Sequence, residues 1–215
     1  MDEERVAAFV QSLDEGNSGI LAEIEQEARR DHVPIIRPQM QSLLRLLLAV
    51  QRPASILEVG TAVGFSTLFI QMHNPVPCRI VTIENYQKRI PIARSNFQRA
   101  GKEKDICLLC GDALEVLPTL SGPFDFIFLD AAKGQYLYFL PHLLRLLAGD
   151  GMLVSDNVLQ EGDILESRFA VTRRNRTIHK RMRQYLYELT HDPTLVTTVL
   201  PVADGVTVSV RRETR

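Results

Sequence analysis

The sequence has 215 residues, enough for one well-buried domain but not for two of ordinary size. It carries 25 Lys and Arg against 26 Asp and Glu, which excludes a uniformly basic protein and leaves only local patches for binding acidic partners. The most apolar run, residues 43–50, is far shorter than the roughly twenty residues of a membrane span. The acidic N-terminal stretch has no apolar core, so we do not expect it to be a secretory signal. We therefore expect one cytoplasmic domain over residues 1–215 that does not enter a membrane.

The first part of the chain has a helical pattern that is broken at Val33-Pro34. We predict that residues 1–53 form a helical cap on a core of residues 54–215. In the core, short apolar runs alternate with amphipathic stretches of helical length, which is typical of a parallel sheet covered on both faces. The predicted strands are residues 56–59, 79–83, 106–110, 124–129 and 152–155, and the helices between them are residues 64–72, 87–100, 113–117 and 135–147.

The chain is predicted to end in two strands, residues 195–200 and 206–210, after a helix over residues 177–189. The link between these strands, Pro201-Val-Ala-Asp204-Gly205, is short and rich in turn residues, which predicts an antiparallel hairpin. The expected fold is therefore α/β and Rossmann-like: a seven-stranded, mostly parallel sheet with a C-terminal antiparallel hairpin and helices on both faces.

Cys107 and Cys110 have the C-x-x-C spacing of redox and zinc motifs. They fall, however, in a predicted strand, in which residues three apart point to opposite faces and lie about 10 Å from each other. We therefore expect no disulfide between them, and we interpret both as small buried residues of the sheet.

A glycine-bearing turn follows the first predicted strand, in the sequence Gly60-Thr-Ala-Val-Gly64-Phe65-Ser66. Such a turn lies at the carboxyl edge of a doubly wound sheet, where ligands bind, and its glycines allow a ligand to approach the backbone. A dinucleotide-binding turn is the alternative, but Phe65 stands where the third glycine of G-x-G-x-x-G would be. S-adenosylmethionine, which has no phosphate to hold at the helix N-terminus, suits this turn better.

Acidic side chains lie at the ends of the first three core strands. Glu58, just before the glycine turn, can accept from the ammonium group of that cofactor or from backbone donors. Glu84 ends the second strand, where a carboxylate can bind both ribose hydroxyls, and Asp112 follows the third strand, where it can face the adenine amino group. Each of them alone can be an ordinary carboxylate, but the three together suit a cationic cofactor.

Polar residues also end the fourth and fifth strands. Asp130 ends one of them with Lys133 three residues on, and Asp156-Asn157 ends the other. Adjacent parallel strands bring these ends to one edge of the sheet, where two carboxylates and an amide supply the oxygen ligands that Mg²⁺ prefers. The metal would lower the pKa of a nucleophilic oxygen, and Lys133 would take its proton or stabilise the oxyanion. Taken alone, Asp156-Asn157 can also be a simple loop start.

These motifs, in this order, resemble the cation-dependent class I O-methyltransferases that include catechol and caffeoyl-CoA O-methyltransferases. The resemblance runs from about Pro34 to Arg211 and rests on the motifs at residues 58–66, 83–84, 111–113, 128–133, 156–157 and 204–205. It implies S-adenosylmethionine and Mg²⁺ as cofactors, a class I methyltransferase fold and a homodimer.

The same resemblance assigns roles to individual residues. Asp130, Asp156 and Asn157 are implied as metal ligands and Lys133 as the catalytic base. Gln41 stands where many relatives have glycine, which weakens the expectation for the methionine end of the cofactor. The cofactor-binding residues that the resemblance implies are Met40, Glu58, Gly60, Ser66, Glu84, Ala113 and Asp130, to which the strand-end position adds Asp112.

A basic segment follows Asp156-Asn157. Glu166 and Glu188 bracket twenty-one residues without an acid, in a chain of net charge −1. Such a segment can neutralise several phosphates of a nucleic acid. A solvated helix face and a site for the phosphates of a coenzyme A thioester are the alternatives. The expected RNA-binding residues are Arg173, Arg174, Arg176, Lys180 and Arg181.

Residues 173–178, Arg-Arg-Asn-Arg-Thr-Ile, resemble the bacterial tRNA 5-hydroxyuridine methyltransferases. In 5-hydroxyuridine the 5-hydroxyl lies beside the 4-carbonyl, so that both oxygens can chelate one metal as a catechol does. The resemblance implies methylation of this base to 5-methoxyuridine at the wobble position of a tRNA anticodon loop. Methylation of a small catechol or phenylpropanoid is the enzymatic alternative, and an RNA-binding or scaffold protein is the non-enzymatic one.

Overall fold

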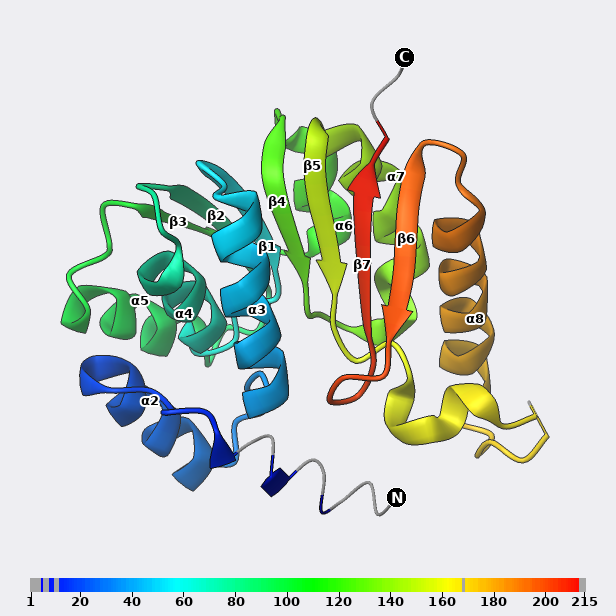
Figure 1. Ribbon diagram of the computed structural model, residues 1–215, viewed down its shortest axis with the longest axis horizontal. Coiled ribbons are helices and arrows are strands. Elements are labelled where there is room, and N and C mark those ends of the chain that lie inside the picture. Colours follow the sequence, from blue (N-terminus) through cyan, green and yellow to red (C-terminus); the bar gives the residue numbers. More distant parts are fainter. Residues whose placement is uncertain (1–4, 6–7, 10–11, 168, 213–215) are drawn as a thin grey trace.

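The computed structural model describes residues 5, 8–9, 12–167 and 169–212. All seven strands that it describes form one sheet in the order β3-β2-β1-β4-β5-β7-β6 (Figure 1). Their bounds are β1 (Ser55–Val59), β2 (Arg79–Glu84), β3 (Ile106–Cys110), β4 (Phe124–Leu129), β5 (Leu147–Ser155), β6 (Leu195–Leu200) and β7 (Val206–Arg211).

The sheet is parallel from β3 to β5 and antiparallel from β5 onward. Neighbouring strands among β1 to β5 pair in parallel, whereas β7 pairs antiparallel with both β5 and β6. The predicted Rossmann-like fold with a C-terminal hairpin is therefore confirmed. The strand order reverses direction between β1 and β4, and in open α/β sheets ligands bind at the carboxyl side of such a reversal.

Helices cover both faces of the sheet (Figure 1). One apolar core joins the sheet to the first four helices, and a second core joins its other face to the last three. Within the described residues, none of the helices is long and apolar enough to cross a membrane. The helices are α2 (Gly19–Arg30), α3 (Pro38–Gln51), α4 (Phe65–His73), α5 (Ile90–Arg99), α6 (Ala113–Val116), α7 (Tyr136–Leu146) and α8 (Arg176–His191), with short 3-10 turns η1 (Leu117–Thr119), η2 (Lys133–Gln135) and η3 (Gln160–Leu165).

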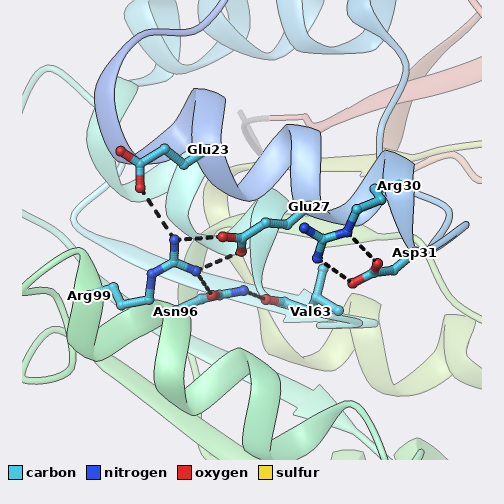
Figure 2. Close-up of polar contacts among 7 residues, drawn as sticks. All are labelled: Glu23, Glu27, Arg30, Asp31, Val63, Asn96 and Arg99. Atoms are coloured by element: carbon cyan, nitrogen blue, oxygen red, sulfur yellow. Dashed lines mark hydrogen bonds and ion pairs between the residues drawn. The ribbon is translucent and has the colours of Figure 1, made fainter.

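Ion pairs attach α2 to α5, two helices far apart in the sequence (Figure 2). The guanidinium of Arg99 contacts the carboxylates of Glu23 and Glu27 at 3.3 and 2.7 Å. Beside it, the side-chain amide of Asn96 donates to the carbonyl of Val63 at 2.8 Å, which ties α5 to the glycine turn. The N-terminal helices are thereby anchored close to the loop that follows β1.

The interpretation of Cys107 and Cys110 as buried residues is wrong, although both are free thiols as expected. Both side chains are exposed. The reason is the position of β3 at the edge of the sheet, where one side of the strand has no neighbour. Only Ile106, at the start of this strand, is buried in the apolar core.

Candidate active site

A cavity of about 550 Å³ opens at the carboxyl edge of the parallel strands. The residues that follow these strands lie side by side in its lining, because neighbouring parallel strands end at the same edge of a sheet. One residue from the end of each of the strands β1 to β5 lines the cavity: Gly60, Glu84, Asp112, Asp130 and Asp156. Four of the acids that the sequence places at separate strand ends therefore line one cavity: Glu84, Asp112, Asp130 and Asp156.

Position 60 requires a glycine for two reasons: its backbone conformation and the lack of space for a Cβ. Its φ of 106° is a value that side chains with a Cβ rarely adopt. A Cβ on this residue would lie 1.9 Å from the carbonyl oxygen of Asp130. The amides of Gly60 and Thr61 both donate to the carbonyl of Ile83, at 3.1 and 3.2 Å. The turn thus holds the ends of β1, β2 and β4 in close contact.

The acids at the ends of β2 and β3 line the cavity and also accept hydrogen bonds from backbone amides. Glu84 is buried, and its two carboxylate oxygens accept from the amides of Ala62 at 2.7 Å and Tyr86 at 2.8 Å. Asp112 caps α6 by accepting from the amide of Leu114 at 2.8 Å. These bonds orient both carboxylates. The other predicted cofactor residues in the lining are Ser66, Ala113 and Asp130.

Two predicted cofactor residues, Met40 and Glu58, are buried and do not belong to the lining of the cavity. Both are 0% exposed, and Met40 belongs to the apolar core. The carboxylate of Glu58 accepts from the hydroxyls of Ser66 at 2.6 Å and Thr82 at 2.5 Å, and also from the hydroxyl of Thr67. Glu58 therefore joins the first turn of α4 to β2. Of its three hydroxyl partners, only Ser66 lines the cavity.

Burial makes Glu58 a source of pH-dependent stability. Despite its three hydroxyl donors, burial raises the pKa of this carboxyl group to about 7. Because the pKa is higher in the folded than in the unfolded chain, the folded state binds the proton more tightly, and this stability is lost as pH rises from about 4.5 to about 7. With about 1.4 kcal/mol for each unit of pKa difference, the expected loss between pH 5 and pH 8 is about 2–3 kcal/mol.

Glu58→Gln is expected to remove this part of the pH dependence while keeping the shape of the side chain. The measurement is the free energy of unfolding in urea at pH 5 and pH 8 for both proteins without added metal. Contributions from acids that do not interact with Glu58 cancel in the difference between the two proteins. An equal loss of stability in wild type and variant would contradict the assignment.

Asp130, Asp156 and Asn157 form one wall of the cavity. Burial and the nearby Asp130 raise the pKa of Asp156 to about 7, and burial raises the pKa of Asp130. Two acids that resist ionisation together favour a cation between them. Within the described residues no three His, Cys, Asp or Glu side chains gather as metal ligands. The amide of Asn157 would complete the set, and its φ of 56° is one that asparagine tolerates. These residues fit a hard cation such as Mg²⁺.

Lys133 lies beside an acid that was not among the predicted site residues. Its ammonium nitrogen is 3.8 Å from a carboxylate oxygen of Asp204, which is 7% exposed and lies in the link between β6 and β7. Both side chains line the cavity. The sequence signal was the Asp204-Gly205 pair, which contributed to the family resemblance but was assigned no role.

The segment before α3 forms another part of the cavity wall and was not among the predicted site residues. Residues 34–37 line the cavity, and the guanidinium of Arg37 lies 3.9 Å from the carboxylate of Glu161 in η3. Gln41 supports this wall, since its side-chain amide donates to the carbonyl of Ile36 at 3.0 Å. The departure at position 41 therefore has a structural role. Nothing in the sequence pattern links Arg37 to Glu161.

Among the described residues of the basic segment, none lines the cavity. The predicted RNA-binding residues divide into two that bond to backbone carbonyls and three that are exposed. Arg176 donates to the carbonyl of Val171 at 3.2 Å, and Arg181 donates to the carbonyl of Gly134 at 3.1 Å while its guanidinium lies over the ring of Tyr138. These two arginines hold the local structure. The exposed members of the group are Arg173, Arg174 and Lys180.

Known proteins share both the sequence pattern and the fold. The family model described as O-methyltransferase matches residues 11–212. The chain belongs to the O-methyltransferase family. A catechol O-methyltransferase of Niastella koreensis is 34% identical over 135 residues, a match that spans 61% of this chain and 61% of that protein. A catechol O-methyltransferase of Mycobacterium tuberculosis is 34% identical over 163 residues, which are 74% of each chain.

The structural similarity of this O-methyltransferase family member extends over nearly the whole chain. The SAH-bound methyltransferase PaMTH1 of Podospora anserina has a TM-score of 0.87 at 27% sequence identity. The comparison covers 98% of this chain and 95% of PaMTH1. The helices before β1 and the hairpin after α8 are therefore part of the shared fold.

Proposed function

We propose that this chain transfers a methyl group from S-adenosylmethionine to a hydroxyl oxygen that lies beside a second oxygen, as in a catechol. The observation that carries the proposal is the set of Asp130, Lys133, Asp156 and Asn157 in one cavity with the glycine turn. Glu84 and Asp112 line the same cavity. Two relatives that are 34% identical are named catechol O-methyltransferases, which favours a small catechol as the substrate.

The cofactor is proposed to lie along the wall made by the ends of β1, β2 and β3. S-adenosylmethionine carries positive charge on its sulfonium and ammonium groups, and Glu84 and Asp112 supply negative charge in this part of the cavity. The backbone amides of Ala62 and Tyr86 orient the carboxylate of Glu84, which leaves lone pairs for ribose hydroxyls. The likeness to the SAH-bound PaMTH1 supports the same cofactor.

The reacting hydroxyl is proposed to lie between the cofactor and the wall of Asp130, Asp156 and Asn157. A divalent cation held by these side chains would lower the pKa of the hydroxyl and bind the second oxygen. Lys133 accepts the released proton when it is a neutral amine, or stabilises the oxyanion when it is an ammonium group that Asp204 keeps near the site. The oxygen then forms its bond to the methyl carbon as the carbon–sulfur bond breaks, which yields a methyl ether and S-adenosylhomocysteine.

The proposal is tested by incubating the protein with S-adenosylmethionine, Mg²⁺ and catechol and measuring the methylated product by mass spectrometry. EDTA is expected to lower the rate to background, because it removes the cation that acidifies the hydroxyl. Added Mg²⁺ in excess of EDTA should restore the rate. Full activity in EDTA would contradict the metal site, and product formation from a monophenol at the same rate would contradict the need for two adjacent oxygens.

A second candidate substrate is 5-hydroxyuridine in a tRNA anticodon loop, with the same chemistry. The observation that favours it is the exposure of Arg173, Arg174 and Lys180. These residues lie in a segment without acids that follows Asp156-Asn157 in the chain. Exposed cations on one segment suit the phosphates on either side of a base presented to the cavity. The known relatives favour the small catechol, so that the two substrates have to be compared directly.

Replacing Arg173, Arg174 and Lys180 together by alanine separates the two substrates. If the substrate is tRNA, kcat/KM for tRNA is expected to fall roughly tenfold or more, since three phosphate contacts are lost, while catechol methylation stays within about twofold. A matched control replaces Arg79 and Lys104, two exposed cations near the opposite edge of the sheet. An equal fall in kcat/KM for both substrates, or no fall for tRNA, would show that the basic segment is a solvated surface that does not bind tRNA.

A further inference from the structure

A buried tyrosine hydroxyl lies between the ends of β4 and β5. Tyr136 is the first residue of α7, and its side chain is 0% exposed. Its hydroxyl lies 3.3 Å from the carbonyl oxygen of Leu129 and 3.1 Å from that of Asp156, and it accepts from the amide of Ala131 at 3.3 Å. A single hydroxyl therefore contacts the backbone of both strand ends.

These backbone partners surround the two acids of the proposed metal site. Leu129 and Ala131 are the residues on either side of Asp130, and the third partner is Asp156 itself. The two strands are also joined directly, because the amide of Asp156 donates to the carbonyl of Leu129 at 3.0 Å. The hydroxyl of Tyr136 adds a link beyond the end of the sheet ladder, at the point where both side chains turn toward the cavity.

The ring of Tyr136 is itself held in place by a second buried tyrosine. Tyr185 of α8 meets it edge to face, with ring centroids 5.5 Å apart and an interplanar angle of 72°. The hydroxyl of Tyr185 lies 2.6 Å from the side-chain oxygen of Ser155, the residue before Asp156, whereas the partners of the Tyr136 hydroxyl are backbone groups. The pair thus offers two equally buried hydroxyls with different partners.

We propose that Tyr136 is a positioning residue, which sets the separation of the Asp130 and Asp156 carboxylates so that both bind one divalent cation. The two acids repel each other when they are ionised, and a link between their backbones resists the resulting displacement. Groups that orient metal ligands without touching the metal typically change its affinity by about 10- to 100-fold. The inference rests on the metal site of the proposed function.

The test compares Tyr136→Phe with Tyr185→Phe, each of which removes one fully buried hydroxyl. Dissociation constants for Mn²⁺ are measured by isothermal titration calorimetry, and thermal unfolding is measured without metal. Tyr136→Phe is expected to weaken Mn²⁺ binding roughly tenfold, whereas Tyr185→Phe should change it less than about twofold at a comparable loss of thermal stability. The methylation rate of Tyr136→Phe should recover as Mg²⁺ is raised, because the catalytic groups are intact.

Equal weakening by both substitutions, or unchanged Mn²⁺ binding in Tyr136→Phe, would overturn the positioning role while leaving the metal site in place. Failure of the wild-type protein to bind Mn²⁺, with full methylation in EDTA, would instead overturn the proposed function and this inference with it. If Tyr136→Phe does not fold, 4-aminophenylalanine at this position keeps a hydrogen-bond donor in the same place. That protein is expected to bind Mn²⁺ within about threefold of wild type, and weaker binding would overturn the role.

Discussion

Asp156→Asn is expected to lower kcat/KM for methyl transfer by more than about a hundredfold, since changes that only disturb the orientation of a metal ligand already cost about 10- to 100-fold. The substitution keeps the size of the side chain and an oxygen that can accept from the amide of Asn157, as Asp156 does at 2.7 Å. It removes one of the two negative charges on the cavity wall. Initial rates at several Mg²⁺ concentrations measure the effect.

The same substitution is expected to leave the metal-free protein at least as stable as wild type above pH 7. Burial and the neighbouring Asp130 raise the pKa of Asp156 to about 7, so the ionised pair destabilises the folded state when no cation is bound. Asp125→Asn is the control for the loss of a carboxylate away from the cavity. This carboxylate accepts from the amides of Ala54 and Ser55 at the opposite end of the sheet. An Asp156→Asn protein that is both unstable and inactive would indicate a structural role for this acid.

Gly60→Ala is expected to lower the free energy of unfolding by more than about 3 kcal/mol. A backbone conformation reserved for glycine costs another residue about 1–3 kcal/mol, and here the added Cβ would lie 1.9 Å from the carbonyl oxygen of Asp130. The oxygen belongs to backbone, so it cannot rotate away as a flexible side chain would. Urea unfolding of the metal-free protein measures the loss.

Gly101→Ala is the matched control for backbone conformation without a clash. Gly101 has a φ of 64°, and a Cβ there would meet nothing within 4 Å. Its expected cost is that of a left-handed residue alone, about 1–2 kcal/mol. Equal costs at both positions would show that the close approach of β1 and β4 at Gly60 does not determine stability.

Local sequence patterns were sufficient to predict most of the sheet. Alternating apolar runs, helical stretches and a turn-rich link led to the strands and the terminal hairpin, because strand period and turn chemistry depend on neighbouring residues. The acids at 84, 112, 130 and 156 were predicted to meet for a related reason: in a parallel sheet, the residue after each strand faces the same edge. The family resemblance supplied the roles that spacing alone left open.

The tertiary structure decided which side chains face the cavity and which support it. Glu58 turns its carboxylate toward three hydroxyls instead of the cavity, and Arg176 and Arg181 bond to carbonyl groups that no short sequence pattern reveals. Asp204 reaches Lys133 only because the hairpin pairs with β5. The sequence by itself determined the strands and their polar ends, since those depend on local periodicity. The orientation of these side chains was decided by the partners that the fold places beside them, because most buried polar atoms are hydrogen-bonded in a folded protein.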